Sequence, residues 1–410
     1  MRILMPCAAF PPFADGGGPI SALIVARLLM NEGHEVRVVH VTDEEAFEDY
    51  EGISVHRVKP LNIYWNYYLP RSPFKKAIWH LLENGNPRAY RFMKREIRSF
   101  KPDVVLTDSI ENVNVATWAA ARSLDVPVAH TIRSAFLLCW KGSMQKDGKS
   151  CIGQCRSCRL TSTGKRLLSR YVDVAIGESD YILETHLKEG YFPNAVPRCI
   201  PGAIPGTLDA QARSYPVSRP FRIGFIGVHT PFKGIDVLAR AASLFPEDVS
   251  VEFLIAGTGR DAFAEEARKL FPSDRTRFLG WTDPDSFFPQ IDLLAFPSIG
   301  REAFGRVAIE AFSKAVPVVG SGIGGIAETV VPDVNGLQVP PEDPQALRDA
   351  LLRIASDRSF YETLSDGALA SADRYKTPAI ASAYSQALEE ALQRRGKYIN
   401  PTHMVTEHKN

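Results

Sequence analysis

The sequence lacks the apolar runs that mark a membrane-spanning chain. No stretch of about 18 residues is uninterrupted by polar groups, and a transmembrane helix needs such a stretch. The apolar start at residues 1–5 is too short for a signal peptide, because Pro6, Pro11, Pro12 and Asp15 break it. We therefore expect a cytoplasmic protein whose first residues form a buried strand.

A charge excess of either sign is also missing. The 410 residues carry a net charge of +1, with 45% hydrophobic and 23% charged residues, as in ordinary globular proteins. This balance gives no reason to expect a nucleic-acid partner. The length predicts two domains, or three.

The first half of the chain repeats a strand–helix–strand pattern. A buried strand at 2–6, three glycines at 16–18, a helix at 20–30 and a strand at 34–41 form a βαβ opening. This order predicts an α/β fold with a doubly wound parallel sheet. The glycine amides precede a helix and could approach a ligand phosphate, although a flexible turn also explains them. Further strands are expected at 104–107, 127–131 and 172–177.

A second series of strands and helices begins at residue 221, after a proline-rich interval at 201–220. Two Rossmann-like domains would face each other across a cleft, where ligands commonly bind. The predicted division is an N-terminal domain at 1–205, a linker at 206–220, a second domain at 221–372, a helix at 373–395 packing back on the first domain, and a loose tail at 396–410.

Residues 61–101 are basic and aromatic. Nine lysines and arginines face only Glu83 and Glu96, and nine aromatic residues are interleaved with them. This composition favours contact with an anionic membrane surface or a lipid-phosphate acceptor. The alternative is a solvated basic helix whose aromatic residues belong to the core. The aromatic residues include Tyr64, Trp65, Tyr67, Tyr68 and Trp79.

Four cysteines gather at 139–158, namely Cys139, Cys151, Cys155 and Cys158. Four thiolates at this spacing could form a tetrahedral site, and zinc is the metal that such a site prefers. In a reducing cytosol, zinc is favoured over two disulfides. Disulfides, redox-active thiols and unlinked thiols stay open as alternatives.

Two glutamates mark the stretch from Pro297 to Glu310. Glu302 lies in the loop after an apolar strand, and Glu310 lies about two turns along the helix that follows. The amides at 304–307 would start this helix, where a phosphate or sugar oxygen can bind. Such a glutamate pair is weak evidence alone, because most pairs of this kind are solvated.

One motif points to a different chemistry. Gly257, Gly259 and Ala262 fit the G-x-G-x-x-A pattern of dinucleotide-binding domains. The acidic residue that would bind the ribose should end the next strand, at 276–281, and that strand contains no acid. The sequence therefore does not favour a nicotinamide cofactor.

Taken together, the motifs resemble those of the retaining GT-B glycosyltransferases of family 4, and of a cysteine-bearing subset within it. The resemblance spans nearly the whole chain. It is carried by Gly16 to Gly18, Gly33-His34-Glu35-Val36, Ile200-Pro201-Gly202, Gly227 through Lys233-Gly234, Ala256 to Gly259, and Pro297-Ser298 through both glutamates to Pro317-Val318-Val319, Gly324-Gly325 and Glu328.

The resemblance implies a nucleotide-diphosphate-sugar donor held mainly by the second domain. Glu310 would accept the ribose hydroxyls, Glu302 would bind a sugar hydroxyl, and Lys233 would neutralise the departing diphosphate. No cofactor is implied for catalysis; zinc would be structural. The other donor-binding positions carried over are Gly17, Gly18, His229, Gly257, Phe304, Gly305 and Arg306.

Arg133 departs from the family pattern. It takes the place of a histidine that, in many members, approaches the outer hydroxyl of the donor sugar. Because a guanidinium suits a carboxylate, Arg133 predicts a uronic acid donor and joins Glu302 and Lys233 as a catalytic candidate. His130 should lie on the other face of its strand, as a core histidine.

The expected function is transfer of a sugar to a glycan or lipid-linked acceptor in bacterial surface polysaccharide or lipopolysaccharide synthesis. The enzyme would act in the cytoplasm, or peripherally at the inner face of the cell membrane. The alternatives are an epimerase on the same fold and a non-catalytic nucleotide-sugar-binding scaffold. Release of nucleoside diphosphate that depends on acceptor would distinguish them.

Overall fold

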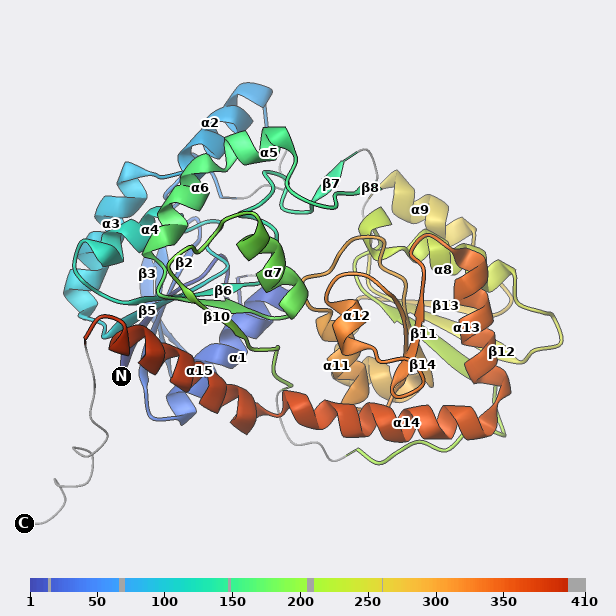
Figure 1. The fold of residues 1–410 in the computed structure, drawn as a ribbon. Coiled ribbons are helices and arrows are strands. Elements are labelled where there is room, and N and C mark those ends of the chain that lie inside the picture. The colour runs from blue at the N-terminus through green and yellow to red at the C-terminus, as the bar shows by residue number, and fades with distance from the viewer. Residues whose placement is uncertain (14–15, 66–70, 147–148, 205–209, 260, 397–410) are drawn as a thin grey trace, which may run out of the picture.

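The computed structural model describes residues 1–13, 16–65, 71–146, 149–204, 210–259 and 261–396. Two predominantly parallel sheets, each covered by helices, lie side by side (Figure 1). The expected α/β architecture is confirmed. Tyr67, Tyr68, part of the expected linker and the expected tail after Gly396 lie outside the described residues.

The first sheet has eight strands in the order β10-β9-β6-β5-β1-β2-β4-β3. All of its neighbours are parallel except β3 and β4, which pair antiparallel. Its strands are β1 (Arg2–Pro6), β2 (Glu35–Val41), β3 (Ala46–Tyr50), β4 (Ile53–Val58), β5 (Val104–Asp108), β6 (Val128–Ile132), β9 (Val174–Gly177) and β10 (Val196–Cys199). Its helices are α1 (Gly17–Asn31), α2 (Pro73–Glu83), α3 (Pro87–Phe100), α4 (Ala116–Arg122), α5 (Arg156–Thr161), α6 (Thr163–Leu168) and α7 (Asp180–Lys188).

The second sheet has six parallel strands in the order β13-β12-β11-β14-β15-β16. The strand order reverses direction beside β11, and in open α/β sheets ligands bind at the carboxyl ends near such a point. The strands are β11 (Phe221–Ile226), β12 (Val251–Ala256), β13 (Thr276–Gly280), β14 (Leu293–Phe296), β15 (Val318–Ser321) and β16 (Gly336–Val339). The helices are α8 (Ile235–Ser243), α9 (Ala262–Lys269), α10 (Pro284–Phe287), α11 (Arg306–Phe312), α12 (Ile326–Thr329), α13 (Pro344–Ser356) and α14 (Arg358–Ala372).

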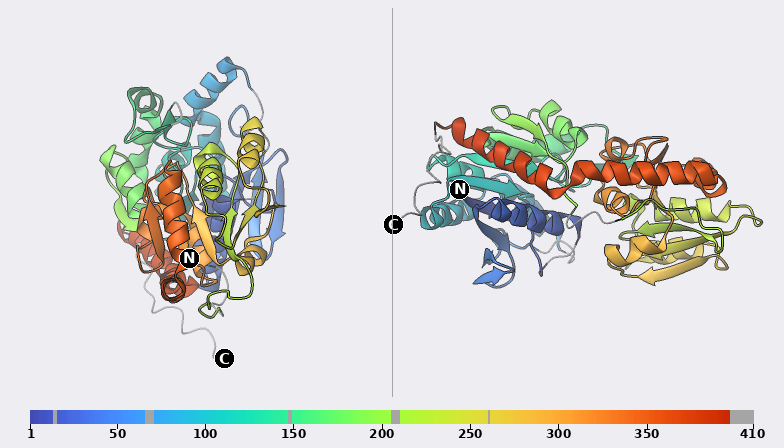
Figure 2. Two further views of the ribbon diagram at one scale, coloured as in Figure 1. Left: turned by 90° about the vertical axis from the view of Figure 1, so that its right-hand side faces the viewer. Right: turned by 90° about the horizontal axis from the view of Figure 1, so that it is seen from below.

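The last helix returns to the first domain. Helix α15 (Thr377–Gln393) follows α14 and runs beneath the first sheet (Figures 1 and 2). Its buried residues Ile380, Tyr384 and Leu388 share a core cluster with α1 and β1. This packing joins the end of the chain to its beginning, so the two domains are connected twice.

Hydrophobic burial accounts for the central strands. In β5 and β6 every residue is buried, as expected for parallel strands covered on both faces. His130 lies in β6 with its Nδ1 2.8 Å from Thr107 Oγ1 and its ring against Trp118. Burial lowers the pKa of His130 to about 3, so the imidazole is neutral, which confirms it as a core histidine.

A small hairpin, β7 (Gln145–Lys146) with β8 (Lys149–Ser150), leads into the cysteine-bearing segment. It extends from the first domain toward the second (Figure 1). Its Ser150 Oγ donates to the backbone oxygen of Ile299 at 3.1 Å. The cysteine-bearing segment therefore contacts the loop that contains Glu302.

No helix among the described residues is both long and apolar enough to cross a membrane.

Candidate donor-binding site

Loops at the carboxyl ends of β11 and β14 meet on the second domain. The short 3₁₀ turn Pro231–Lys233 follows β11, and the loop after Phe296 follows β14. The amides of Ile299 and Gly300 donate to the backbone oxygen of Phe232 at 2.9 and 3.0 Å. These backbone bonds alone fix the two loops against each other, without a contribution from side chains.

Lys233 and Glu302 are brought together by this arrangement. Lys233 Nζ lies 2.7 Å from Glu302 Oε1, and Ser298 Oγ donates to the same oxygen at 2.9 Å. The lysine side chain is 27% exposed and the glutamate 15%, so both remain reachable by a ligand. The pair holds a cation near the point where the strand order of the sheet reverses, where ligands of open α/β sheets commonly bind. Lys233 is the residue predicted to neutralise the departing diphosphate.

The second predicted glutamate has a different partner. Arg306 Nε lies 2.6 Å from Glu310 Oε1, one helical turn away in α11. Burial raises the pKa of Glu310, and the neighbouring Arg306 opposes that rise. Arg306 Nη1 also lies 3.4 Å from Ser21 Oγ and from the backbone oxygen of Ala203. Arg306 therefore links the second domain to the first.

The predicted glycines Gly17 and Gly18 begin α1, at this same junction. A Cβ on Gly17 would lie 3.8 Å from Arg306 Cδ. Gly305 precedes α11 with a φ of 97°, and Phe304 is buried against Tyr375. The structure thus brings Gly17, Arg306 and Glu310 together.

The G-x-G-x-x-A segment has a packing explanation. Gly257 follows β12 with a φ of 103°, and a Cβ there would collide with the backbone of Gly227. A Cβ on Gly259 would collide with Ala264 and His229. His229 Nε2 is 3.4 Å from the backbone oxygen of Ala256, and burial lowers the pKa of His229. These glycines allow two loops to approach closely.

The structure places Arg133 in a buried cluster with two carboxylates, which does not favour its predicted role in donor binding. Its Nε and Nη2 donate to both oxygens of Asp108 at 2.6 and 2.7 Å, and its Nη1 donates to Glu178. The side chain is 4% exposed. Burial alone would lower the pKa of Arg133, but Asp108 and Glu178 hold it well above its usual value. Because the guanidinium is buried and already paired with two protein carboxylates, it is not presented to a donor sugar in this structure.

Contacts between the domains converge on α7. Glu328 in α12 accepts from the amides of Asp180 and Tyr181 at 2.9 and 2.5 Å, so a carboxylate of one domain caps a helix of the other. Ser179 Oγ, which also caps α7, donates to the backbone oxygen of Ala303 at 2.5 Å. These bonds fasten the start of α7 to Ala303, which follows Glu302, and to α12.

Comparison with known families agrees with this geometry. Residues 15–205 match the sequence model described as Glycosyltransferase Family 4. Residues 220–357 match the model described as Glycosyl transferases group 1. The first segment contains every strand of the first sheet except β1, and the second contains all six strands of the second sheet. The chain is a glycosyltransferase of the family 4 type.

The glycosyltransferase has relatives over most of its length. An uncharacterized 42.6 kDa protein in the cps region of Klebsiella pneumoniae is 29% identical over 82% of this chain and 90% of its own. An uncharacterized glycosyltransferase of Methanocaldococcus jannaschii is 25% identical over 90% of this chain and 92% of its own. The similarity therefore extends across both domains.

Solved structures support the GT-B fold of this glycosyltransferase. Sucrose-phosphate synthase from Thermosynechococcus elongatus superimposes with a TM-score of 0.73 at 20% identity, covering 96% of this chain and 99% of that one. HepE from Anabaena, solved in complex with UDP, superimposes with a TM-score of 0.70 at 19% identity, covering 95% and 99%. The predicted pair of Rossmann-like domains is confirmed as GT-B.

The cysteines of the glycosyltransferase gather without a bond between them. All six are free thiols, and Cys158 Sγ lies 3.8 Å from Cys139 Sγ. Among the residues that the structure describes, no group of three or more histidine, cysteine or acidic side chains is placed to hold a metal ion. Zinc at Cys139, Cys151, Cys155 and Cys158 stays a prediction.

Three contacts of the site could not be read from the sequence. Asp108 and Glu178 end β5 and follow β9, and only the strand order shows that they flank Arg133. Glu328 belongs to a family motif, but the amides that it caps lie 148 and 147 positions away. The sequence did contain one signal for the Arg133 cluster, because Asp108 and Glu178 each directly follow a predicted strand.

Proposed function

We propose that this glycosyltransferase is a retaining hexosyltransferase that uses a nucleotide-diphosphate sugar. The observation that carries the proposal is the Lys233–Glu302 pair at 2.7 Å, at the carboxyl edge of the second sheet. A fixed cation there can stabilise the charge that grows on a departing diphosphate. The adjacent carboxylate can accept a hydroxyl of the sugar that is being transferred.

In the proposed reaction, the bond between the sugar C1 and the diphosphate oxygen breaks while the acceptor oxygen bonds to C1 on the same face. The acceptor proton passes to a phosphate oxygen, so the products are the glycoside and a nucleoside diphosphate. Lys233 neutralises the leaving group, and Glu302 orients the sugar. Glu310 would hold the ribose hydroxyls once Arg306 shares or releases it. No carboxylate acts as a glycosidase-type nucleophile in this scheme.

The proposed acceptor is a glycan or lipid-linked sugar of a bacterial surface polysaccharide or lipopolysaccharide, met at the inner face of the cell membrane. The relative from Klebsiella pneumoniae supports this setting, because its name places it in the cps region. The UDP complex of HepE makes uridine nucleotides the first donors to test.

The test begins with donor binding. UDP-glucose, UDP-glucuronate and GDP-mannose are compared by thermal shift, since a ligand that binds only the folded protein raises its melting temperature. The best donor is then incubated without acceptor, and the anomer first released by slow hydrolysis is followed by proton NMR. Initial release of the donor's own anomer supports retention. Initial release of the opposite anomer would refute the proposal. It would also be refuted if none of the three donors raised the melting temperature.

A further inference from the structure

We propose that α2, α5 and α6 together form a docking surface for an anionic lipid bilayer. This surface, here called the α2–α5–α6 surface, comprises Phe74, Lys75, Lys76, Leu81, Leu160 and Leu167. It narrows the membrane contact expected of residues 61–101 to α2 and adds two helices from elsewhere in the chain. The biological purpose of this surface rests on the proposed function. Its binding to lipid does not, because that binding can be measured without a sugar substrate.

Helix α2 presents an apolar stripe to solvent. Phe74 is 74% exposed and Leu81 is 72% exposed, and residues seven apart lie on one side of a helix. The opposite side of α2 holds the buried residues Trp79 and Glu83. Because the helix already has a buried side, its exposed apolar side is available to a partner.

Helices α5 and α6 add to this stripe from residues about 80 positions later. Leu160 is 78% exposed and Leu167 is 51% exposed. Both α2 and α5 lie at the same end of the first domain, in Figure 1 and in the left-hand view of Figure 2. Asn84 Nδ2, just after α2, donates to the backbone oxygen of Thr161 at 2.6 Å, which confirms that the helices adjoin.

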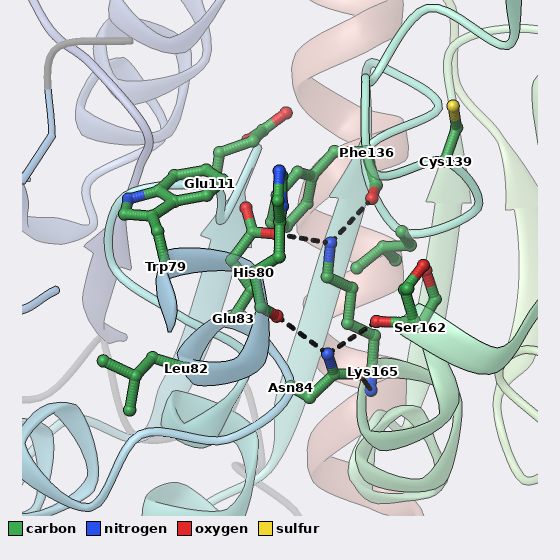
Figure 3. Close-up of polar contacts among 12 residues, drawn as sticks. Trp79, His80, Leu82, Glu83, Asn84, Glu111, Phe136, Cys139, Ser162 and Lys165 are labelled. Carbon is green, nitrogen blue, oxygen red and sulfur yellow. Dashed lines mark hydrogen bonds and ion pairs between the residues drawn. The ribbon is translucent and has the colours of Figure 1, made fainter. Parts of the chain in front are cut away.

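A buried ion pair holds α2 and α6 together. Lys165 Nζ in α6 lies 3.2 Å from Glu83 Oε2 in α2 and donates to the backbone oxygen of Phe136 at 3.1 Å (Figure 3). Both side chains of the pair are 1% exposed. A Cβ on Gly164 would collide with Asn84, so the helix ends approach as closely as the backbone permits. The surface is therefore preformed.

The charge of this surface selects an acidic partner. Helices α5 and α6 contain no acidic residue, and their Arg156 and Arg159 are exposed, whereas Lys165 is buried. Helix α2 adds the exposed Lys75 and Lys76. The one acid of α2, Glu83, is buried against Lys165. Arg159 is paired with Glu189 at 2.7 Å, so it contributes less than the others. Exposed lysines beside exposed leucine and phenylalanine fit lipid headgroups above acyl chains.

The experiment measures cosedimentation of the full chain with vesicles of equal parts phosphatidylcholine and phosphatidylglycerol, and with pure phosphatidylcholine. We expect binding to the acidic vesicles that weakens with salt. The variant Phe74→Ser/Lys75→Gln should bind at least about fivefold more weakly, the loss expected for one lysine near an anionic surface.

The matched control is Trp281→Ser/Lys269→Gln. It also removes one lysine and one large exposed apolar residue, Trp281 at 73% exposure, but from the second domain. Unchanged vesicle binding in this control supports the surface. Equal losses in both variants, or equal binding to both vesicle types, would overturn it.

Two further measurements distinguish lipid binding from self-association and from catalysis. Sedimentation velocity without lipid tests whether the stripe joins two copies of the chain; a dimer that Leu81→Ser dissociates would overturn the lipid assignment. Turnover of UDP-glucose in lipid-free buffer should be the same in the wild type and in Phe74→Ser/Lys75→Gln. Vesicle binding without any sugar turnover would refute the proposed function while leaving the surface in place.

Discussion

Lys233 and Glu302 lie 69 positions apart in sequence and 2.7 Å apart in space. The backbone bonds from Ile299 and Gly300 to Phe232 fix their loops, so the pair does not depend on its own attraction to form. With both side chains partly exposed, the pair is a modest contributor to stability. Its position at the carboxyl edge of the sheet fits the chemical role proposed for it above.

Replacing Lys233 with alanine should lower kcat by about 10²- to 10³-fold, the range seen when one group that stabilises transition-state charge is removed. KM for the donor should change less, because the charge on the diphosphate grows mainly during bond cleavage. Release of nucleoside diphosphate in steady state measures both. Lys314→Ala, which removes a lysine paired with the exposed Asp285, is the control and should keep full activity. A Lys233→Ala enzyme that loses only donor affinity would contradict the assignment.

Arg133→Ala should lower the free energy of unfolding strongly and leave the choice of donor largely unchanged. Without the guanidinium, Asp108 and Glu178 are left as buried carboxylates with no cation, a loss of about 3–5 kcal/mol in the free energy of unfolding. Urea denaturation followed by circular dichroism measures it. Arg122→Ala, at an exposed ion pair, should change the same quantity by no more than about 0.5 kcal/mol. Similar values for the two variants would show that the Arg133 cluster is not structural.

Glu328→Ala should loosen the contact between the domains. The carboxylate caps α7 from the other domain, and loss of a helix cap costs about 0.5–2 kcal/mol. We expect Glu328→Ala to have a larger radius of gyration than the wild type in small-angle X-ray scattering. Adding donor should change this radius less in the variant than in the wild type. Glu184→Ala, which removes an exposed acid of α7 itself, is the matched control. An unchanged radius of gyration in Glu328→Ala would mean that Arg306 and α15 suffice to hold the domains.

The sequence predicted the central strands because they are continuous apolar runs between glycine and proline breaks, and such runs form wherever a sheet is covered on both faces. It missed the β3–β4 hairpin at the edge of the first sheet. There Glu51 and Gly52 both have positive φ, with values of 54° and 84°, and form the turn. Strand β3 is half exposed, so its pattern of burial is not a continuous apolar run.

Some contacts of the candidate site could also be predicted from the sequence, and others could not. Lys233 and Glu302 could be assigned because each follows a predicted strand and because their motifs resemble those of a family. Arg133 could not, because its role depends on two carboxylates whose distance is set by the order of β5, β6 and β9. The same limit applies to Glu83 and Lys165, whose 82-residue separation hides the joint between α2 and α6.

Cys155 should be the most reactive of the six thiols toward iodoacetamide at neutral pH. A hydrogen bond from Ser157, whose Oγ lies 3.2 Å from the sulfur, and the amide of Cys158 lower the pKa of Cys155 to about 7. Burial raises the pKa of Cys158 to about 12, and burial together with Asp180 does the same for Cys199. Because the thiolate is the reacting form, Cys155 is far more ionised at neutral pH than Cys158 or Cys199.

Mass spectrometry of the alkylated peptides as a function of pH measures this difference. The labelling rate at Cys155 should rise through about pH 7, and Ser157→Ala should move that rise to higher pH by removing a hydrogen bond to the thiolate. Cys199, which is exposed, is the internal control for access. Equal labelling of Cys199 and Cys155 would contradict the assignment. Slower labelling of Cys155 with added zinc, reversed by a chelator, would in addition support the predicted metal site, because a coordinated thiolate is protected.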